Sequence, residues 1–148
     1  MPTTETDLWP ANLLDARTDS PVDLLKAQAE LLYSKTNNKL RGRIESGELS
    51  YGRSLKVTFE GQESELELTK PAFAHSLQIQ VPKLKNYSYE LLKIKHGVTL
   101  YPIAAQMAGE DGPATLIKDE SALQRWIQQC LGSPTARQVI STLIAVAK

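Results

Sequence analysis

The chain contains few residues that ordinarily carry reaction chemistry, with one cysteine and two histidines among 148 residues. A single cysteine cannot form an intrachain disulfide, which suits a reducing compartment, so we expect a cytoplasmic protein. His75, His96 and Cys130 lie at no short spacing, whereas zinc normally needs four such ligands, or three plus water. We therefore predict that these side chains are structural, and that the protein has no metal, no cofactor and no catalytic residues.

Long apolar runs and an excess of charge of one sign are also missing. No stretch approaches the roughly 18 apolar residues of a membrane span, and the N-terminus lacks the basic start and apolar run of a secretory signal. Seventeen basic and seventeen acidic residues cancel to a formal charge of zero. This balance argues against binding nucleic acid through bulk charge, although a local basic patch remains open.

Glycine is not abundant either, but one pair invites comparison with a phosphate-binding loop. Residues 47–54 read Gly-Glu-Leu-Ser-Tyr-Gly-Arg-Ser, which has the spacing of that motif with arginine where lysine belongs. The motif needs a strand before it and a helix after it, so that backbone N–H groups point at the phosphate. Residues 55–59 instead alternate as a strand does, so we interpret the segment as a turn.

The most extensive pattern in the chain is the alternation of apolar and polar residues from Leu55 to Ile103. A period of two places successive side chains on opposite faces of a sheet, so one face is apolar and has to be covered. The expected strands are 39–45, 53–60, 65–70, 74–81, 87–95 and 98–104, with a further short strand at 114–117.

Two hairpins follow from the turn signals. Residues 61–64 are expected to join the second and third strands, and His96-Gly97 is expected to join the fifth and sixth as a loop of two residues. Each loop sets a register, because the length of a hairpin loop decides which residues face each other. A register that opposes Phe59 and Leu66 keeps the apolar residues of the first hairpin on one face. If the second loop has two residues, Ile94 faces Thr99 and Leu92 faces Tyr101.

Three helices are predicted from their start signals. Ser20-Pro21 and Ser133-Pro134 each combine a capping hydroxyl with a proline at the first helical position, and Asp119 can cap another helix. The first helix is expected to run to about Ser34 or Thr36, the second to Gly132 and the third through Ala147.

Together these segments predict an α+β fold. Its antiparallel meander sheet of about six strands is packed on the apolar face by the N-terminal helix and the two C-terminal helices, and its polar face stays open. Residues 20–148 are expected to form a single domain, preceded by an N-terminal arm of residues 1–19.

Apolar residues on this arm and on the C-terminal helices indicate a protein interface. The third helix and Trp126 offer more apolar surface than one sheet face is expected to cover. With no catalytic groups in sight, we predict a non-enzymatic protein-binding module of accessory, adaptor or immunity type. It would act on a protein partner or as a homodimer, with no membrane partner. The interface candidates are Trp9, Leu13, Leu14, Trp126, Ile140 and Ile144.

A basic cluster supports an alternative function, the binding of RNA or single-stranded DNA. Basic residues alternate on the first expected strand, and lysines with interleaved tyrosines surround the fifth. Such a patch can hold a single strand by phosphate contacts and stacking, although lysines on strands also guard sheet edges. A second alternative is a small enzyme whose pocket the sequence does not reveal. The nucleic-acid candidates are Lys39, Arg41, Arg43, Lys83, Lys85, Tyr87, Tyr89, Lys93 and Lys95.

Overall fold

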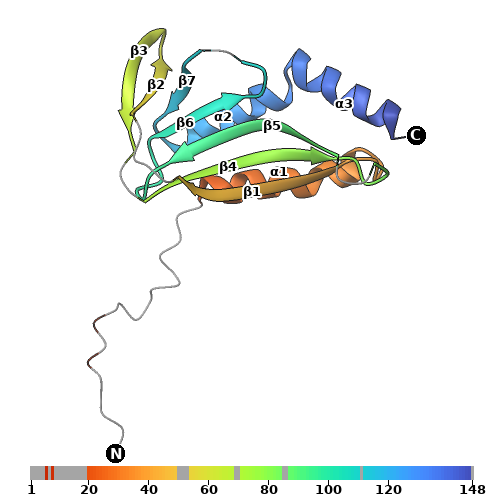
Figure 1. Cartoon of the computed structure of the whole chain (residues 1–148), viewed down its shortest axis with the longest axis horizontal. Helices are drawn as coiled ribbons and strands as arrows, with labels where there is room; N and C mark the ends of the chain where they lie inside the picture. The colour runs from red at the N-terminus through yellow and green to blue at the C-terminus, as the bar shows by residue number, and fades with distance from the viewer. Residues whose placement is uncertain are drawn as a thin grey trace, which may run out of the picture.

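In the part of the chain that the structure describes, seven strands form one sheet and three helices lie against it, an α+β fold as predicted (Figure 1). The computed structural model describes residues 6, 8, 20–49, 54–68, 71–84, 87–110 and 112–147. No helix among these residues is long and apolar enough to cross a membrane. The elements are α1 (Pro21–Lys35), β1 (Arg41–Leu49), β2 (Ser54–Phe59), β3 (Gln62–Glu67), β4 (Ala72–Gln80), β5 (Ser88–His96), β6 (Ile103–Met107), β7 (Ala114–Ile117), α2 (Glu120–Leu131) and α3 (Pro134–Val146).

The strands are not arranged as a meander. Their order across the sheet is β1-β4-β5-β6-β7-β2-β3, and β2 runs parallel to β7 while all other neighbours are antiparallel. The prediction of about six strands in an antiparallel meander is therefore wrong in number, order and one direction. Strand β2 follows β1 in sequence but pairs at the other side of the sheet, and local alternation carries no information on such a long-range pairing.

The β2–β3 hairpin closes through two residues rather than the four predicted. Glu60 (φ 51°) and Gly61 (φ 80°) both take the left-handed conformation that a tight hairpin turn needs. The predicted pairing of Phe59 with Leu66 is wrong, because the shorter loop brings residues nearer to the turn into register. The facing pairs are Phe59 with Gln62 and Leu55 with Leu66.

The hairpin predicted around His96-Gly97 has a longer connection instead. Strand β5 continues through His96 and β6 begins at Ile103, so residues 97–102 join the two strands. The predicted pairs with Thr99 and Tyr101 are wrong, because the buried contacts of the His96 ring, described below, keep this residue in the strand. The facing pairs are Ile94 with Ala105 and Leu92 with Met107.

The helix starts are those predicted. The Ser20 hydroxyl accepts the backbone N–H of Asp23, and the Asp23 carboxylate accepts the backbone N–H of Ser20 in return. The side chains of Asp119 and Ser133 accept the backbone N–H three residues further on in the same way. Each helix begins where a short polar side chain satisfies donors that would otherwise lack partners.

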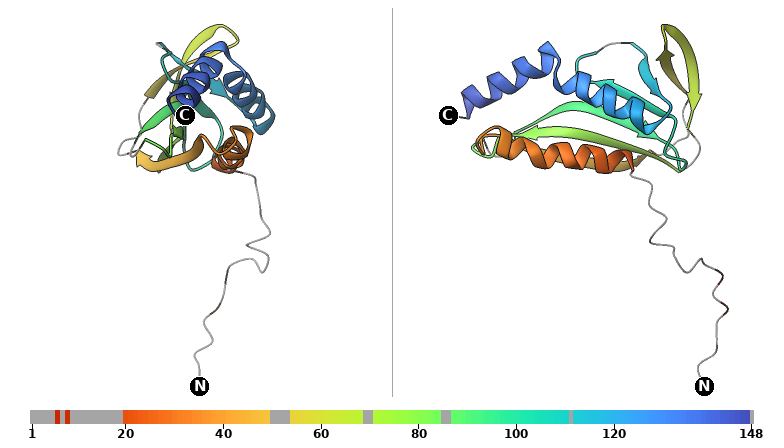
Figure 2. Two further views of the ribbon diagram at one scale, coloured as in Figure 1. Left: turned by 90° about the vertical axis from the view of Figure 1, so that its right-hand side faces the viewer. Right: turned by 180° about the vertical axis from the view of Figure 1, so that it is seen from behind.

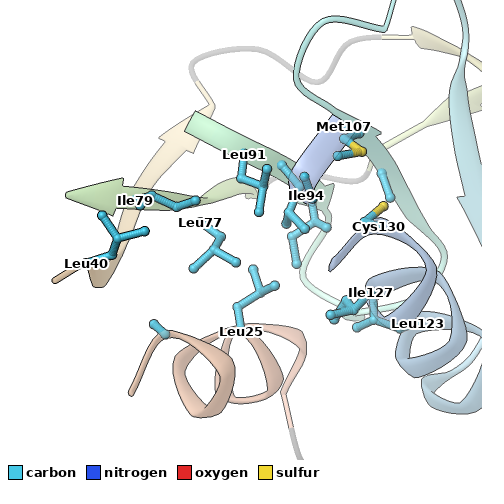
Figure 3. Close-up of a cluster of buried hydrophobic side chains, with 14 of the residues drawn as sticks. Leu25, Leu40, Leu77, Ile79, Leu91, Ile94, Met107, Leu123, Ile127 and Cys130 are labelled. Atoms are coloured by element: carbon cyan, nitrogen blue, oxygen red, sulfur yellow. The ribbon is translucent and has the colours of Figure 1, made fainter. Parts of the chain in front are cut away.

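The core lies between the sheet and the helices. In Figure 1 the helices lie behind the sheet, and in the right-hand view of Figure 2, from behind, they lie in front of it. The β2–β3 hairpin extends beyond the helices in both figures, so the predicted cover by helices holds for only part of the sheet. Figure 3 shows core side chains between the layers, among them Leu25, Leu77, Ile79, Ile94, Leu123 and Ile127.

Gly42 permits a very close approach of α1 to β1. A Cβ atom at this position would lie 2.5 Å from the Cα and 2.6 Å from the carbonyl oxygen of Ala29. Only a residue without a side chain fits between this strand and this helix.

A β-bulge in β5 puts two consecutive leucines into the core. Leu92 faces Leu77, but Glu90 faces Gln78, which leaves Leu91 as the extra residue of the bulge. Leu91 and Leu92 are both buried. The alternation after the bulge then directs Lys93 and Lys95 to the open face and Ile94 and His96 to the helix side.

Candidate functional site

A hollow of about 290 Å³ opens between α1 and the C-terminal helices, and β4 and β5 form its floor. Leu31, at its mouth, is 46% exposed although it is a large apolar residue. The apolar residues of its wall and floor are Ala29, Leu31, Leu32, Leu77, Ile79, Leu91, Leu131 and Ile140.

A second hollow, of about 380 Å³, lies between α1 and α2 and shares Gln28 and Leu131 with the first. We call the two hollows together the trough. Gln28, Gln124 and Gln128 add neutral amides to its lining, and Lys35 is the one charged residue among the described residues that line it. The trough is therefore an apolar surface with a polar rim and one positive charge.

Helix α1 forms one wall of the trough because it carries two apolar stripes. Leu25, Ala29 and Leu32 follow the spacing of the buried stripe that faces the sheet. Leu24 and Leu31, seven residues apart, form a neighbouring stripe that the sheet does not cover. This second stripe is the sequence signal that the prediction of interface residues missed.

The predicted interface residues do not form one surface in the part of the chain that the structure describes. Trp126, Ile140 and Ile144 are partly buried and pack against the core, and of these only Ile140 lines the trough. Trp9, Leu13 and Leu14 lie outside the described residues.

The open face of the sheet carries a separate hollow, of about 400 Å³, which we call the basin. Lys93 and Lys95 of β5 line one side of it, and Lys56 of β2 lines another. Glu63 of β3 is the one carboxylate among the described residues of the lining. The remaining lining residues are small or neutral: Leu55, Ala104, Gln106, Gly112, Pro113 and Ala114.

The predicted nucleic-acid residues do not form one patch. Lys93 and Lys95 meet in the basin, but Tyr89 packs against the core on the other face. Tyr87 precedes β5 and lies six residues before Lys93, which is about 20 Å along a strand. Lys85 lies outside the described residues, Lys83 lies in the turn after β4, Lys39 precedes β1, and Arg41 and Arg43 lie on β1 beyond β4.

A chain of short hydrogen bonds links β1, β4 and β5 through the two histidines. Ser46 Oγ lies 2.7 Å from His75 Nδ1, His75 Nε2 lies 2.9 Å from His96 Nε2, and His96 Nδ1 lies 2.7 Å from the carbonyl oxygen of Gly97. A carbonyl only accepts, so in the neutral pair His96 donates to Gly97 and accepts from His75, and Ser46 donates to His75. Both rings are buried.

This order of groups resembles a nucleophile, a base and a group that orients the base. Burial, and after it the positive charges of His96 and Lys26, together lower the pKa of His75 from its ordinary 6.5 to about 4. A base with so low a pKa removes protons poorly at neutral pH. We therefore interpret the chain of hydrogen bonds as a structural tie that joins three strands.

Cys130 is buried on the apolar side of α2, as predicted, and burial raises the pKa of its thiol to about 11. Among the described residues no group of three or more His, Cys, Asp or Glu side chains is placed to hold a metal ion. The chain matches no protein-family model, and no curated protein or solved structure is significantly similar to it. The trough and the basin are therefore the surfaces from which a function can be argued.

Proposed function

We propose that the domain is a non-enzymatic protein-binding module, and that its trough binds an apolar segment of a partner protein. The observation that carries this proposal is an apolar hollow in which Leu31 stays 46% exposed, between elements that are otherwise well packed. Burying such a surface against a partner is the usual way in which an exposed apolar patch is covered.

The shape of the trough favours a helix as the bound segment. It runs between two layers of helices, α1 on one side and α2 with α3 on the other, and its floor is a sheet. A groove of this kind accepts an amphipathic helix, whose apolar residues recur every three or four positions. Lys35 is the one charge that the described part of the chain places in the lining, so a carboxylate on the partner helix would be the complementary group.

The expected affinity decides how the partner has to be captured. Three leucine-sized anchors contribute about 5–9 kcal/mol of burial before any cost of association. Ordering and orientation subtract several kcal/mol from this, so binding is expected to be micromolar or weaker. Washing steps would lose such a complex, and a covalent trap is needed.

The test is site-specific photo-crosslinking in the native host, with a benzophenone amino acid at position 31. Position 98 is the matched control, because Val98 is 57% exposed but lies in the connection of residues 97–102, away from the trough. The proposal expects a protein that crosslinks from position 31 only, through an acidic amphipathic helix, and whose crosslinking falls with Lys35→Glu. Equal crosslinking from both positions, or a second copy of the chain as the crosslinked species, would contradict it.

Binding of RNA or single-stranded DNA has less support as a function. The candidate tyrosines that would stack on bases do not join the lysines of the basin, since Tyr89 packs against the core. Stacking is a large part of how proteins hold single strands, so lysines alone favour a different ligand.

A further inference from the structure

We propose that the N-terminal arm, residues 1–19, docks into the trough of its own chain and occupies it until a partner helix displaces the arm. This inference rests on the proposed function, because it assigns a regulator to the same groove. Leu8, a residue of the arm that the structure describes, is 88% exposed, and Leu31 at the mouth of the trough is 46% exposed. A single contact within the chain would cover both of these large apolar side chains.

The arm has the chemistry that the trough selects. Its apolar anchors come in two pairs, Leu-Trp at 8–9 and Leu-Leu at 13–14. Trp9 and Leu13 are four residues apart, which is the spacing at which an amphipathic segment presents anchors to a groove. Four carboxylates and one basic side chain, Arg17, accompany the anchors, so the arm carries a net negative charge. The chain therefore contains a segment of the kind argued above for the partner.

The length of the arm decides how far along the trough it reaches. Leu24 and Gln28 line the end of the trough that lies within two turns of the start of α1. Residues 15–20 join the second anchor pair to α1, and six residues span up to about 20 Å, which is enough for the chain to turn back to this end. From Leu24 to Leu31 the groove extends about 10 Å along α1, a distance that residues 8–13 can cover.

Charge complementarity favours the same placement, in which the arm runs antiparallel to α1. Lys35 lies at the end of the trough that Leu31 lines. The antiparallel arm brings Asp7, which precedes the first anchor pair, to this end. A parallel arm would instead bring Arg17 toward Lys35, where like charges repel. It would also leave only residues 18–20 to return to the start of α1, about 20 Å away.

A weak contact is sufficient because the arm is tethered to the groove. A short flexible linker gives the attached segment an effective concentration of about 1 mM. With a dissociation constant of about 0.1 mM, typical of a few apolar anchors, the arm would occupy the trough in roughly nine of ten molecules. A partner then meets an open trough in only one molecule of ten, so its apparent affinity falls about tenfold.

The first test uses the purified full chain with the benzophenone amino acid at position 31. Trypsin releases residues 1–17 as one peptide, because Arg17 is the first Lys or Arg of the sequence. Mass spectrometry should find this peptide joined to position 31 through residues 7–14, and not joined to the control position 98. Absence of the crosslink from position 31 would overturn the proposal, as would equal yields from the two positions. Joined peptides from two differently labelled chains in a mixture would also overturn it.

A double variant of the arm, Leu13→Glu with Leu14→Glu, removes one anchor pair. It should abolish most of the crosslink from position 31, because two charges cannot be buried against the leucines of the trough. Thr3→Glu with Thr4→Glu is the matched control, because it adds the same charges to the arm outside the anchors and should leave the crosslink unchanged. Equal loss in both double variants would contradict docking through the anchors.

The same arm variant in the native host separates this inference from the proposed function. It should give several-fold more crosslinking of the partner from position 31 than the parent chain gives, and a misfolded protein would not produce such a gain. If both chains capture the partner equally, the arm does not regulate the trough and the proposed function stands. If the purified chain shows the arm crosslink but the arm variant captures no partner, docking of the arm is confirmed and the proposed function fails.

Discussion

Replacing Gly42 by alanine would place a methyl group where α1 crosses β1. The new Cβ would lie 2.5 Å from the Cα, 2.6 Å from the carbonyl oxygen and 2.8 Å from the Cβ of Ala29. Carbon atoms prefer a separation of about 3.5–4.0 Å, so the helix has to move away by about 1 Å. Overpacking of this kind typically costs about 1–3 kcal/mol, and the displaced helix also loses contacts of Leu25, which is fully buried.

We expect Gly42→Ala to lower the free energy of unfolding by about 2–4 kcal/mol. For a chain of this size that corresponds to a fall in Tm of about 5–12 °C. Urea unfolding followed by circular dichroism measures the free energy, and a thermal scan measures Tm. Gly47→Ala is the matched control, because Gly47 lies in the same strand with no atom within 4 Å of the added Cβ. That variant should be as stable as the parent, or more stable by up to about 1 kcal/mol.

The double variant Gly42→Ala with Ala29→Gly separates a backbone clash from a side-chain clash. Removing the Ala29 methyl relieves only the 2.8 Å contact, and the two shorter contacts involve backbone atoms that remain. Stability should therefore not return. Full recovery in the double variant, or a Gly42→Ala protein as stable as the parent, would refute this reasoning.

Three further predictions concern buried groups. The pKa of His75 is about 4 in the folded protein and ordinarily 6.5. Neutral His75 therefore contributes fully to the free energy of unfolding above pH 6.5, and this contribution is lost as the pH falls through 4. The free energy of unfolding should fall by about 1–2 kcal/mol. This is less than the full change in the pKa of His75 implies, because Ser46, its hydrogen-bond partner, is exposed to solvent. Urea unfolding between pH 7 and 4 measures it, and a His75→Gln variant with the same pH slope would contradict it. The Tyr101 hydroxyl is buried and has no hydrogen-bond partner among the described residues, so Tyr101→Phe should leave stability unchanged or raise it by up to about 1 kcal/mol in urea unfolding. A large loss would mean that the hydroxyl has a partner. Cys130, buried and with a pKa near 11, should react with Ellman's reagent only after unfolding, and rapid reaction of the native protein would show that α2 opens.

The parts of the fold that depend on neighbouring residues could be predicted from the sequence. Ser20, Asp119 and Ser133 mark helix starts because capping is a contact over three residues. Leu55, Val57 and Phe59 indicate a strand because alternation is a local pattern. The predicted register of the β2–β3 hairpin was wrong because its turn uses an uncommon backbone conformation. Glu60 takes a positive φ, which its residue type does not indicate.

The candidate surfaces were predictable only in part. The alternation of Lys93 and Lys95 indicated a basic face, but their meeting with Lys56 depends on β2 lying beside β7. The bulge at Leu91 also shifts the alternation of β5 by one residue. Strict alternation predicts that Tyr89 and Lys93 share a face of the sheet, but the bulge places them on opposite faces. The pairing of His75 with His96 joins two strands through side chains 21 residues apart, and no spacing rule anticipates it.

The last residue of β1, Leu49, lies directly opposite the first residue of β4, Ala72. Strands β1 and β4 are thus already a hairpin, and residues 50–71 are an insertion at its tip. The main core cluster contains no residue of this insertion. Yet Leu55, Lys56 and Glu63, which form one side of the basin, all belong to it. One wall of the basin is therefore built by a stretch of chain outside the main core cluster, and this stretch is held to the sheet by the pairing of β2 with β7 and by the burial of its own Val57.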